Sequence, residues 1–158
     1  MKEKARQPVL VSACLLGEHC RYDGDHCRDE RLESELAAEG LVAQPFCPEQ
    51  HGGLGTPRAA AWIEGESASA VLAGRARMVD EHDRDVTAEF LAGAKGALEL
   101  CRSSGATRAF LKERSPSCGV ANTYAGGLLV EGPGVTTELL QRSGIRCVGV
   151  EGKRKTAD

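Results

Sequence analysis

The sequence predicts a single α/β domain, a Rossmann-like fold with a mainly parallel sheet flanked by helices and with long Gly/Pro-rich active-site loops. Three observations support this prediction. Short apolar runs that suit buried strands alternate with segments of helical periodicity. Helices separate most of the strands, which favours parallel pairing. At 158 residues, with 41% hydrophobic content, the chain fits one domain with its own core.

The first third of the chain gives clear local signals. Residues 9–13 form an apolar run that predicts a buried first strand. Residues 29–39 predict a helix, because Leu32 and Leu36 lie at helical spacing and Gly40 suits the C-cap.

The next signals are weaker. Residues 41–46 predict a second strand. Residues 52–65 are rich in Gly and Pro, so we expect a long, partly ordered loop that contains Trp62. Residues 68–79 predict a short hairpin around Ala73-Gly74.

The second half contains the strongest helix, residues 85–104, which has an apolar face and ends at Gly105. That face consists of Phe90, Ala94, Leu98 and Cys101. The remaining predicted elements are strands at 107–111, 128–130 and 145–150 and a helix at 136–142. The sequence leaves the strand order open.

Composition excludes several classes of function. Aromatic residues make up 4% of the chain and the formal net charge is −3, which argues against a nucleic-acid surface. The N-terminus is charged and no apolar run is long enough for a secretory signal or a membrane span. We therefore expect a cytoplasmic protein with no membrane partner. In that compartment, seven cysteines suggest metal ligands or reactive thiols rather than disulfides.

The expected domain organisation is simple. We expect a flexible N-terminus at residues 1–8, one domain at 9–151 and a C-terminal tail at 152–158. The tail holds the only basic run, Lys153-Arg154-Lys155, which we interpret as a solvated end. The sequence leaves the oligomeric state open.

Three cysteines follow predicted strands at the points where the strands end. They are Cys14, Cys47 and Cys118. The carboxyl ends of parallel strands meet at one edge of a sheet, so we expect the three thiols to converge. Three thiolates without an obvious fourth ligand suggest a metal centre with one position left open for chemistry.

The other four cysteines have different surroundings. Cys101 lies on the apolar face of the long helix and Cys147 lies inside the last strand, so we interpret both as buried core residues. Cys20 and Cys27 lie in a charged loop with two histidines, and we expect them to be exposed thiols. That Cys- and His-rich stretch lacks the regular ligand pairs of a structural zinc site.

Polar residues near the strand-end cysteines add chemistry. Glu49 lies two residues beyond Cys47, where a closed pocket beside thiolates would suit it to general acid or base catalysis. Ser115 and Ser117 precede Cys118 and provide hydroxyl groups. Arg21 and Tyr22 offer a cation and a ring that suit a planar or anionic ligand.

These motifs together resemble one family, the thiouracil desulfidases, over residues 9–151. The motifs are Ser-Ala-Cys-Leu-Leu-Gly (12–17), Cys-Arg-Tyr-Asp-Gly (20–24), Cys-Pro-Glu-Gln (47–50), Gly-Gly-Leu-Gly-Thr-Pro-Arg (52–58), Asp-Val-Thr (85–87) with Phe90 and Gly93-Ala94, Leu-Lys-Glu-Arg-Ser-Pro-Ser-Cys-Gly (111–119) and Gly-Val-Thr (134–136). Their number and order make the resemblance specific.

The resemblance implies an iron-sulfur enzyme that removes sulfur from thiolated pyrimidines without net redox chemistry. It implies that Cys14, Cys47 and Cys118 hold a 4Fe-4S cluster whose fourth iron binds the substrate sulfur. Water would then attack the carbon while Glu49 transfers protons, which makes the reaction a hydrolytic cleavage of the C–S bond, and Ser115 assists. The product is a uracil-type base and hydrogen sulfide.

We expect the substrate to be a small thiolated pyrimidine, either a base or a nucleotide. Around it we expect five further side chains: Ser12, Arg21, Tyr22, Lys112 and Ser117. The alternative is a 4Fe-4S electron-transfer protein or a sulfur carrier without catalysis of its own.

The sequence departs from the usual family pattern at two places. Relatives often have prolines and a glutamate where this chain has Ala59-Ala60-Ala61-Trp62, and an aspartate where it has Ala125. Neither position is a predicted cluster ligand. Both changes leave open which thiolated substrate is preferred.

Overall fold

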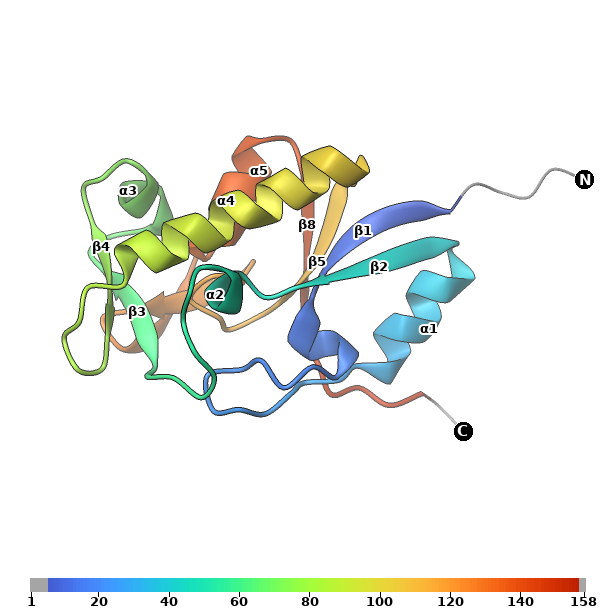
Figure 1. Cartoon of the computed structure of the whole chain (residues 1–158), viewed down its shortest axis with the longest axis horizontal. Helices are drawn as coiled ribbons and strands as arrows, with labels where there is room; N and C mark the ends of the chain where they lie inside the picture. The colour runs from blue at the N-terminus through green and yellow to red at the C-terminus, as the bar shows by residue number, and fades with distance from the viewer. Residues whose placement is uncertain (1–5, 157–158) are drawn as a thin grey trace, which may run out of the picture.

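The computed structural model describes residues 6–156, and its strands form two four-stranded sheets (Figure 1). Sheet A has the order β2-β1-β5-β8, and every neighbouring pair is parallel. Its strands are β1 (Gln7–Ser12), β2 (Leu41–Phe46), β5 (Arg108–Lys112) and β8 (Arg146–Val150). The expectation of a mainly parallel sheet is confirmed.

Helices cover both faces of sheet A. Val9 and Val11 pack with α1 (Glu30–Ala38) in one apolar cluster. Leu10, between them, packs on the other face with α4 (Thr87–Ser104) and α5 (Val135–Arg142). The alternation of side chains along β1 therefore supplies two cores. The strand order reverses direction between β1 and β5, so a crevice opens there beyond the carboxyl ends of the strands.

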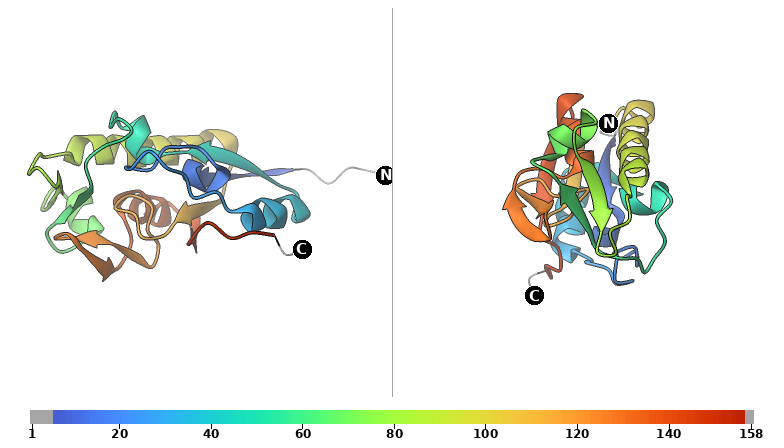
Figure 2. Two further views of the ribbon diagram at one scale, coloured as in Figure 1. Left: turned by 90° about the horizontal axis from the view of Figure 1, so that it is seen from below. Right: turned by 90° about the vertical axis from the view of Figure 1, so that its left-hand side faces the viewer.

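Sheet B has the order β4-β3-β6-β7 and extends the domain away from sheet A (Figure 1). It consists of β3 (Ala61–Glu64), β4 (Arg77–Asp80), β6 (Asn122–Ala125) and β7 (Leu128–Glu131). Both outer pairs are antiparallel, whereas β3 and β6 run parallel. The short helix α3 (Ala68–Leu72) connects β3 to β4. Figures 1 and 2 show α4 running past both sheets, which unites them in one body.

Two glycines of α4 allow a close approach of α2 (Pro48–His51), the one-turn helix that follows Cys47. A Cβ atom on Gly93 would lie 2.1 Å from the Pro48 carbonyl oxygen, and one on Gly96 would lie 2.4 Å from the His51 ring. Larger residues at these positions would push α2 away, so the glycines set the depth at which Glu49 lies.

The structure corrects several predicted elements. Residues 61–64 form β3 inside the segment expected to be a loop, and residues 68–72 form α3 instead of one arm of a hairpin. The Ser67 side chain accepts a hydrogen bond from the Ala70 backbone N–H, and this N-cap starts a helix where a hairpin around Ala73-Gly74 was expected.

Three further elements were not predicted from the sequence. They are α2, β6 and a 3-10 turn, η1 (Ala13–Leu16), which directly follows β1. The first strand therefore ends at Ser12, one residue earlier than expected. It also begins at Gln7, inside the segment expected to be a flexible N-terminus, whose residues 1–5 lie outside the described part of the chain.

The C-terminal tail is packed against the domain, where a solvated end was expected. The Arg154 guanidinium lies 2.8 Å from a carboxylate oxygen of Asp29, which is fully buried at the N-cap of α1. The Lys153 backbone N–H donates to the Cys27 carbonyl. The tail thus closes the loop that carries Cys20 and Cys27. Within residues 6–156, no helix is both long and apolar enough to cross a membrane.

Candidate active site

One cavity of about 280 Å³ lies where the carboxyl ends of sheet A face sheet B. All ten residues predicted for the site line it: Ser12, Cys14, Arg21, Tyr22, Cys47, Glu49, Lys112, Ser115, Ser117 and Cys118. The predicted convergence of the three strand-end thiols is therefore confirmed, while their role as ligands stays a prediction. The volume is at the small end of the range for small-molecule sites.

Each thiol reaches the cavity from a different strand. Cys14 lies in η1 after β1, Cys47 is the N-cap of α2 after β2, and Cys118 lies in the loop after β5. Cys14 and Cys118 are buried and Cys47 is half-buried. Burial raises the pKa of Cys118 to about 11.

Two more thiols lie beside them, which corrects the expectation that Cys20 and Cys27 are exposed. Both are buried, at 4% and 1% exposure. The neighbouring Cys20 and Cys27 thiols, together with burial, raise the pKa of Cys14, and the neighbouring Cys14 and Cys47 thiols lower the pKa of Cys20. The Cys47 Sγ lies 3.7 Å from the Cys20 carbonyl oxygen. The four thiols therefore influence one another's protonation.

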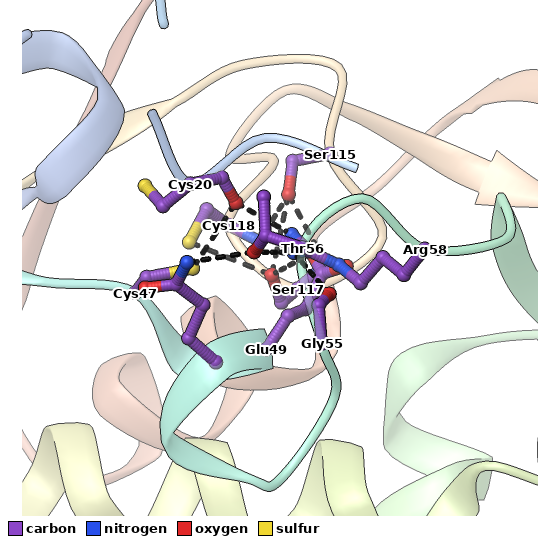
Figure 3. Close-up of polar contacts among 10 residues, drawn as sticks. Cys20, Cys47, Glu49, Gly55, Thr56, Arg58, Ser115, Ser117 and Cys118 are labelled. Carbon is purple, nitrogen blue, oxygen red and sulfur yellow. Dashed lines mark hydrogen bonds and ion pairs between the residues drawn. The ribbon is translucent and has the colours of Figure 1, made fainter. Parts of the chain in front are cut away.

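Glu49 is buried and held at both carboxylate oxygens (Figure 3). The Arg58 Nε donates to Oε1 at 3.0 Å, and the Ser117 hydroxyl donates to Oε2 at 2.9 Å. Arg58 and Glu49 are only 8% and 11% exposed, so each charge compensates the other away from bulk water.

Arg58 was not predicted as a site residue, although it closes the Gly-rich motif 52–58. Besides Glu49, its guanidinium donates to the Cys20 carbonyl at 2.8 Å and to the Gly55 carbonyl and Thr56 hydroxyl. The planar guanidinium of Arg58 thus joins Glu49, the acid/base candidate, to the loop that carries Cys20.

A second buried carboxylate, that of Glu113, stabilises the loop that carries Cys118. Glu113 is buried and accepts backbone hydrogen bonds from Val120, Ala121 and Asn122. Within that loop, the Ser115 hydroxyl accepts from the Cys118 N–H at 3.0 Å and lies 3.3 Å from the Ser117 hydroxyl. Ser115 therefore reaches Glu49 through Ser117.

The remaining predicted residues lie on the cavity wall with their own partners. The Ser12 hydroxyl accepts from the Lys112 backbone N–H at 2.9 Å, and Lys112 Nζ donates to the Glu113 carbonyl. Arg21 lies 3.9 Å from an Asp23 carboxylate oxygen, and Tyr22 is 46% exposed.

The donor set fits an iron-sulfur cluster. Soft thiolate ligands are what such clusters require, and nearby cations favour the anionic state. The cations on the wall are Arg21, Arg58, Lys112 and Arg114. No group of three His, Cys, Asp or Glu side chains within residues 6–156 is arranged around a single metal ion. The cysteine ligands of a cluster bind different iron atoms, so the fit rests on the thiols that share the cavity.

Comparisons with known proteins agree with the site. The sequence model of the 2-thiouracil desulfurase family matches residues 9–151. The chain is 38% identical over 143 residues to the uncharacterized protein YbbK of Bacillus subtilis (strain 168), which covers 89% of this chain and 93% of that protein. It is 44% identical to the solved structure of the 4Fe-4S-dependent thiouracil desulfidase TudS, with a TM-score of 0.78 and 91% of each chain covered. The chain therefore belongs to the 2-thiouracil desulfurase family.

Proposed function

We propose that this protein is a 4Fe-4S-dependent, non-redox desulfidase that exchanges the sulfur of a thiolated pyrimidine for oxygen. The observation that carries the proposal is one cavity that joins the strand-end thiols Cys14, Cys47 and Cys118 to the buried carboxylate of Glu49. The family match and the likeness to TudS support the same cofactor and substrate class.

In this proposal Cys14, Cys47 and Cys118 would hold the cluster. When bound, it would supply Lewis-acidic iron, which suits the soft sulfur of a thiocarbonyl group. The overall reaction consumes one water, which supplies the oxygen of the product, and the sulfur leaves as hydrogen sulfide. No electrons are gained or lost overall.

Glu49 is the proposed proton acceptor. Arg58 and Ser117 each use one of its oxygens, which leaves further lone pairs free for a water molecule. The ion pair with Arg58 holds the carboxylate in one orientation. Glu49 would take a proton from the attacking water and return it to the ring or to the departing sulfur.

The remaining predicted residues surround the substrate in this scheme. Ser115 and Ser117 form a chain of hydroxyls that ends at Glu49 and orients water or the ring. Ser12, Arg21, Tyr22 and Lys112 would contact the base or the anionic groups of a nucleotide.

The decisive experiment is anaerobic reconstitution with iron and sulfide, followed by an assay with 2- and 4-thiouracil. We expect loss of thiouracil absorbance, release of sulfide, and an unchanged oxidation state of the cluster by electron paramagnetic resonance. Protein without iron is the control and should be inactive. Loaded protein that leaves both thiouracils intact would refute the proposal.

The state of the cysteines supports a cytoplasmic location for the protein. All seven cysteines are free thiols. Because free, closely packed thiols persist in a reducing environment, we place the protein in the cytoplasm.

A further inference from the structure

Aromatic residues are scarce in this chain but concentrated around the cavity. The chain has six of them, three Phe, two Tyr and one Trp. Four line the cavity: Tyr22, Phe46, Trp62 and Tyr124. The mechanism proposed above uses neither Trp62 nor Tyr124, so their presence at the site needs its own explanation.

The register of sheet B places Trp62 beside Tyr124. Ile63 of β3 pairs with Ala125 of the parallel strand β6, so the residues one position earlier are also neighbours. Ile63 and Ala125 both pack into the apolar cluster shared with α4. Successive side chains alternate between the faces of a strand, so Trp62 and Tyr124 lie together on the opposite face, and both line the cavity.

An apolar row continues on both sides of this pair. Trp62 pairs with Val79 of β4, which is buried, and Tyr124 pairs with Leu129 of β7, which is 42% exposed. Val79 therefore supports the pair on one side, and Leu129 extends it towards solvent. Of the four residues in this row, Trp62 and Tyr124 line the cavity, and they give it an aromatic wall.

The opposite wall has different chemistry. Cys14, Cys47, Cys118 and Glu49 follow the strands of sheet A, and Arg58 reaches Glu49 from the segment that precedes β3. A molecule between the two walls would meet polar and sulfur groups on one side and aromatic surface on the other. A flat ring with a thiocarbonyl group at its edge matches this division, because aromatic side chains stack on any planar π-system.

We propose that Trp62 and Tyr124 form a stacking wall that holds the planar ring of the substrate and makes the enzyme select unsaturated rings. This proposal rests on the proposed desulfidase function. It assigns specificity to ring planarity, separately from the thiocarbonyl group that reacts. Trp62 is expected to contribute more than Tyr124, because an indole ring offers the larger surface.

The test compares 2-thiouracil with 5,6-dihydro-2-thiouracil, which keeps the thiocarbonyl group but has a saturated, puckered ring. Wild-type loaded enzyme should prefer 2-thiouracil. In Trp62→Ala the preference, as a ratio of kcat/KM values, should fall on the order of tenfold, mainly through a higher KM for 2-thiouracil. Trp62→Phe keeps a ring and should stay near wild type, and Tyr124→Ala should show a smaller loss.

Leu128→Ala is the matched control. Leu128 lies in the same hairpin as Tyr124, is 70% exposed and does not line the cavity, so its replacement should change no kinetic constant. The iron content and Tm of every variant show whether it is folded and contains the cluster. If Trp62→Ala does not fold, the substrate preference of Tyr124→Ala is compared with that of Trp62→Phe instead.

Trp62 also reports on the contact directly, because it is the only tryptophan. Uracil, as product, should inhibit turnover competitively and change the Trp62 emission over the same concentration range. Inhibition without any change in emission, or an unchanged substrate preference in loaded Trp62→Ala, would overturn the stacking wall. Loaded wild type that acts on neither substrate would instead refute the desulfidase function, and the stacking wall with it.

Discussion

The cysteines of this chain lie in two regions that are similar in burial but differ in their polar surroundings. In the first, which we call the strand-end region, Cys14, Cys47 and Cys118 gather with their neighbours Cys20 and Cys27 at the carboxyl edge of sheet A. The core thiols, Cys101 and Cys147, lie between α4, α5 and the sheet. Cys101 is 1% exposed and Cys118 is 4% exposed, so exposure does not separate the two groups.

Charge and hydrogen bonding separate them. Burial alone raises the pKa of Cys101, and burial first of all raises that of Cys147 to about 12. Burial also raises the pKa of Cys118, but hydrogen bonds from Ser12 and Ser117 act in the opposite direction, and the Ser117 hydroxyl lies 3.6 Å from the Cys118 Sγ. Burial is the only cause that acts on Cys101. Polar partners that can stabilise a thiolate are therefore placed around Cys118 and not around Cys101.

The largest expected effect is loss of the cluster from the strand-end region. Cys14→Ser, Cys47→Ser and Cys118→Ser should each lower bound iron sharply and abolish turnover, because a serine hydroxyl is a poor soft ligand. Cys101→Ala is the matched control from the core and should keep its iron. Iron and sulfide per chain after anaerobic reconstitution give the measurement. A full cluster in any of the three serine variants would remove that residue from the proposed ligand set.

The second effect tests the buried carboxylate that only the strand-end region has. Glu49→Gln keeps a similar shape and can still accept from Ser117, but it cannot take a proton. Turnover should fall on the order of 10²- to 10⁴-fold with the iron content unchanged. Single-turnover decay of thiouracil absorbance measures the step. Glu99→Gln, an exposed change on α4, should have no effect. Near-wild-type rates in Glu49→Gln would exclude Glu49 as the acid or base.

The third effect tests the guanidinium that joins Glu49 to the Cys20 loop. Arg58→Lys keeps the charge but cannot reach Glu49, the Cys20 carbonyl and Thr56 together. We expect kcat to fall on the order of ten- to a hundredfold with little change in KM, since Glu49 loses its orientation. Steady-state kinetics on protein that contains the cluster measure kcat and KM separately. A change confined to KM would make Arg58 a substrate-binding residue instead.

Much of the difference between the two regions could be predicted from the sequence. Apolar runs that end in Cys14, Cys47 and Cys118 place thiols at strand ends, and helical spacing places Cys101 in the core. Both predictions use periodicity and strand direction, which are local properties. The same local signals gave the bounds of α1, α4 and β2 closely.

The rest depends on contacts between distant segments. Cys20 and Cys27 lie in a polar stretch, and they are buried by an apolar cluster with distant residues and by contacts with the tail and Arg58. Two equivalent serines flank Pro116, and sequence alone cannot show that Ser117 contacts Glu49 while Ser115 caps the turn. Likewise, β3 lies inside a Gly/Pro-rich segment, and one of its two partner strands, β6, lies about sixty residues away in sequence, so local signals did not reveal it.

A smaller effect tests the tail that braces the strand-end region. Arg154→Ala leaves the buried Asp29 carboxylate with its α1 backbone contact alone. Because Arg154 itself is 37% exposed, we expect a loss of about 1–2 kcal/mol and a Tm lower by a few degrees. Thermal unfolding of the protein with and without iron measures it, and Lys155→Ala serves as the neighbouring control. An unchanged Tm would show that the tail does not stabilise the domain.

The smallest expected effect concerns Cys20, which lines the cavity beside the three proposed cluster ligands but is not proposed as a ligand itself. The Cys47 Sγ and the Arg58 guanidinium both donate to the Cys20 carbonyl, so the backbone position of Cys20 does not depend on its own thiol. Cys20→Ser should therefore bind a full complement of iron and retain turnover. Iron analysis, electron paramagnetic resonance and the thiouracil assay on the same preparation give the answer. If iron is lost as completely as in Cys14→Ser, Cys20 is a fourth protein ligand, and no iron is left open for the substrate sulfur. If three cysteines bind the cluster, one iron remains open and the cavity can bind a cluster and a reacting molecule. If Cys20 is a fourth ligand, the cavity binds a cluster alone.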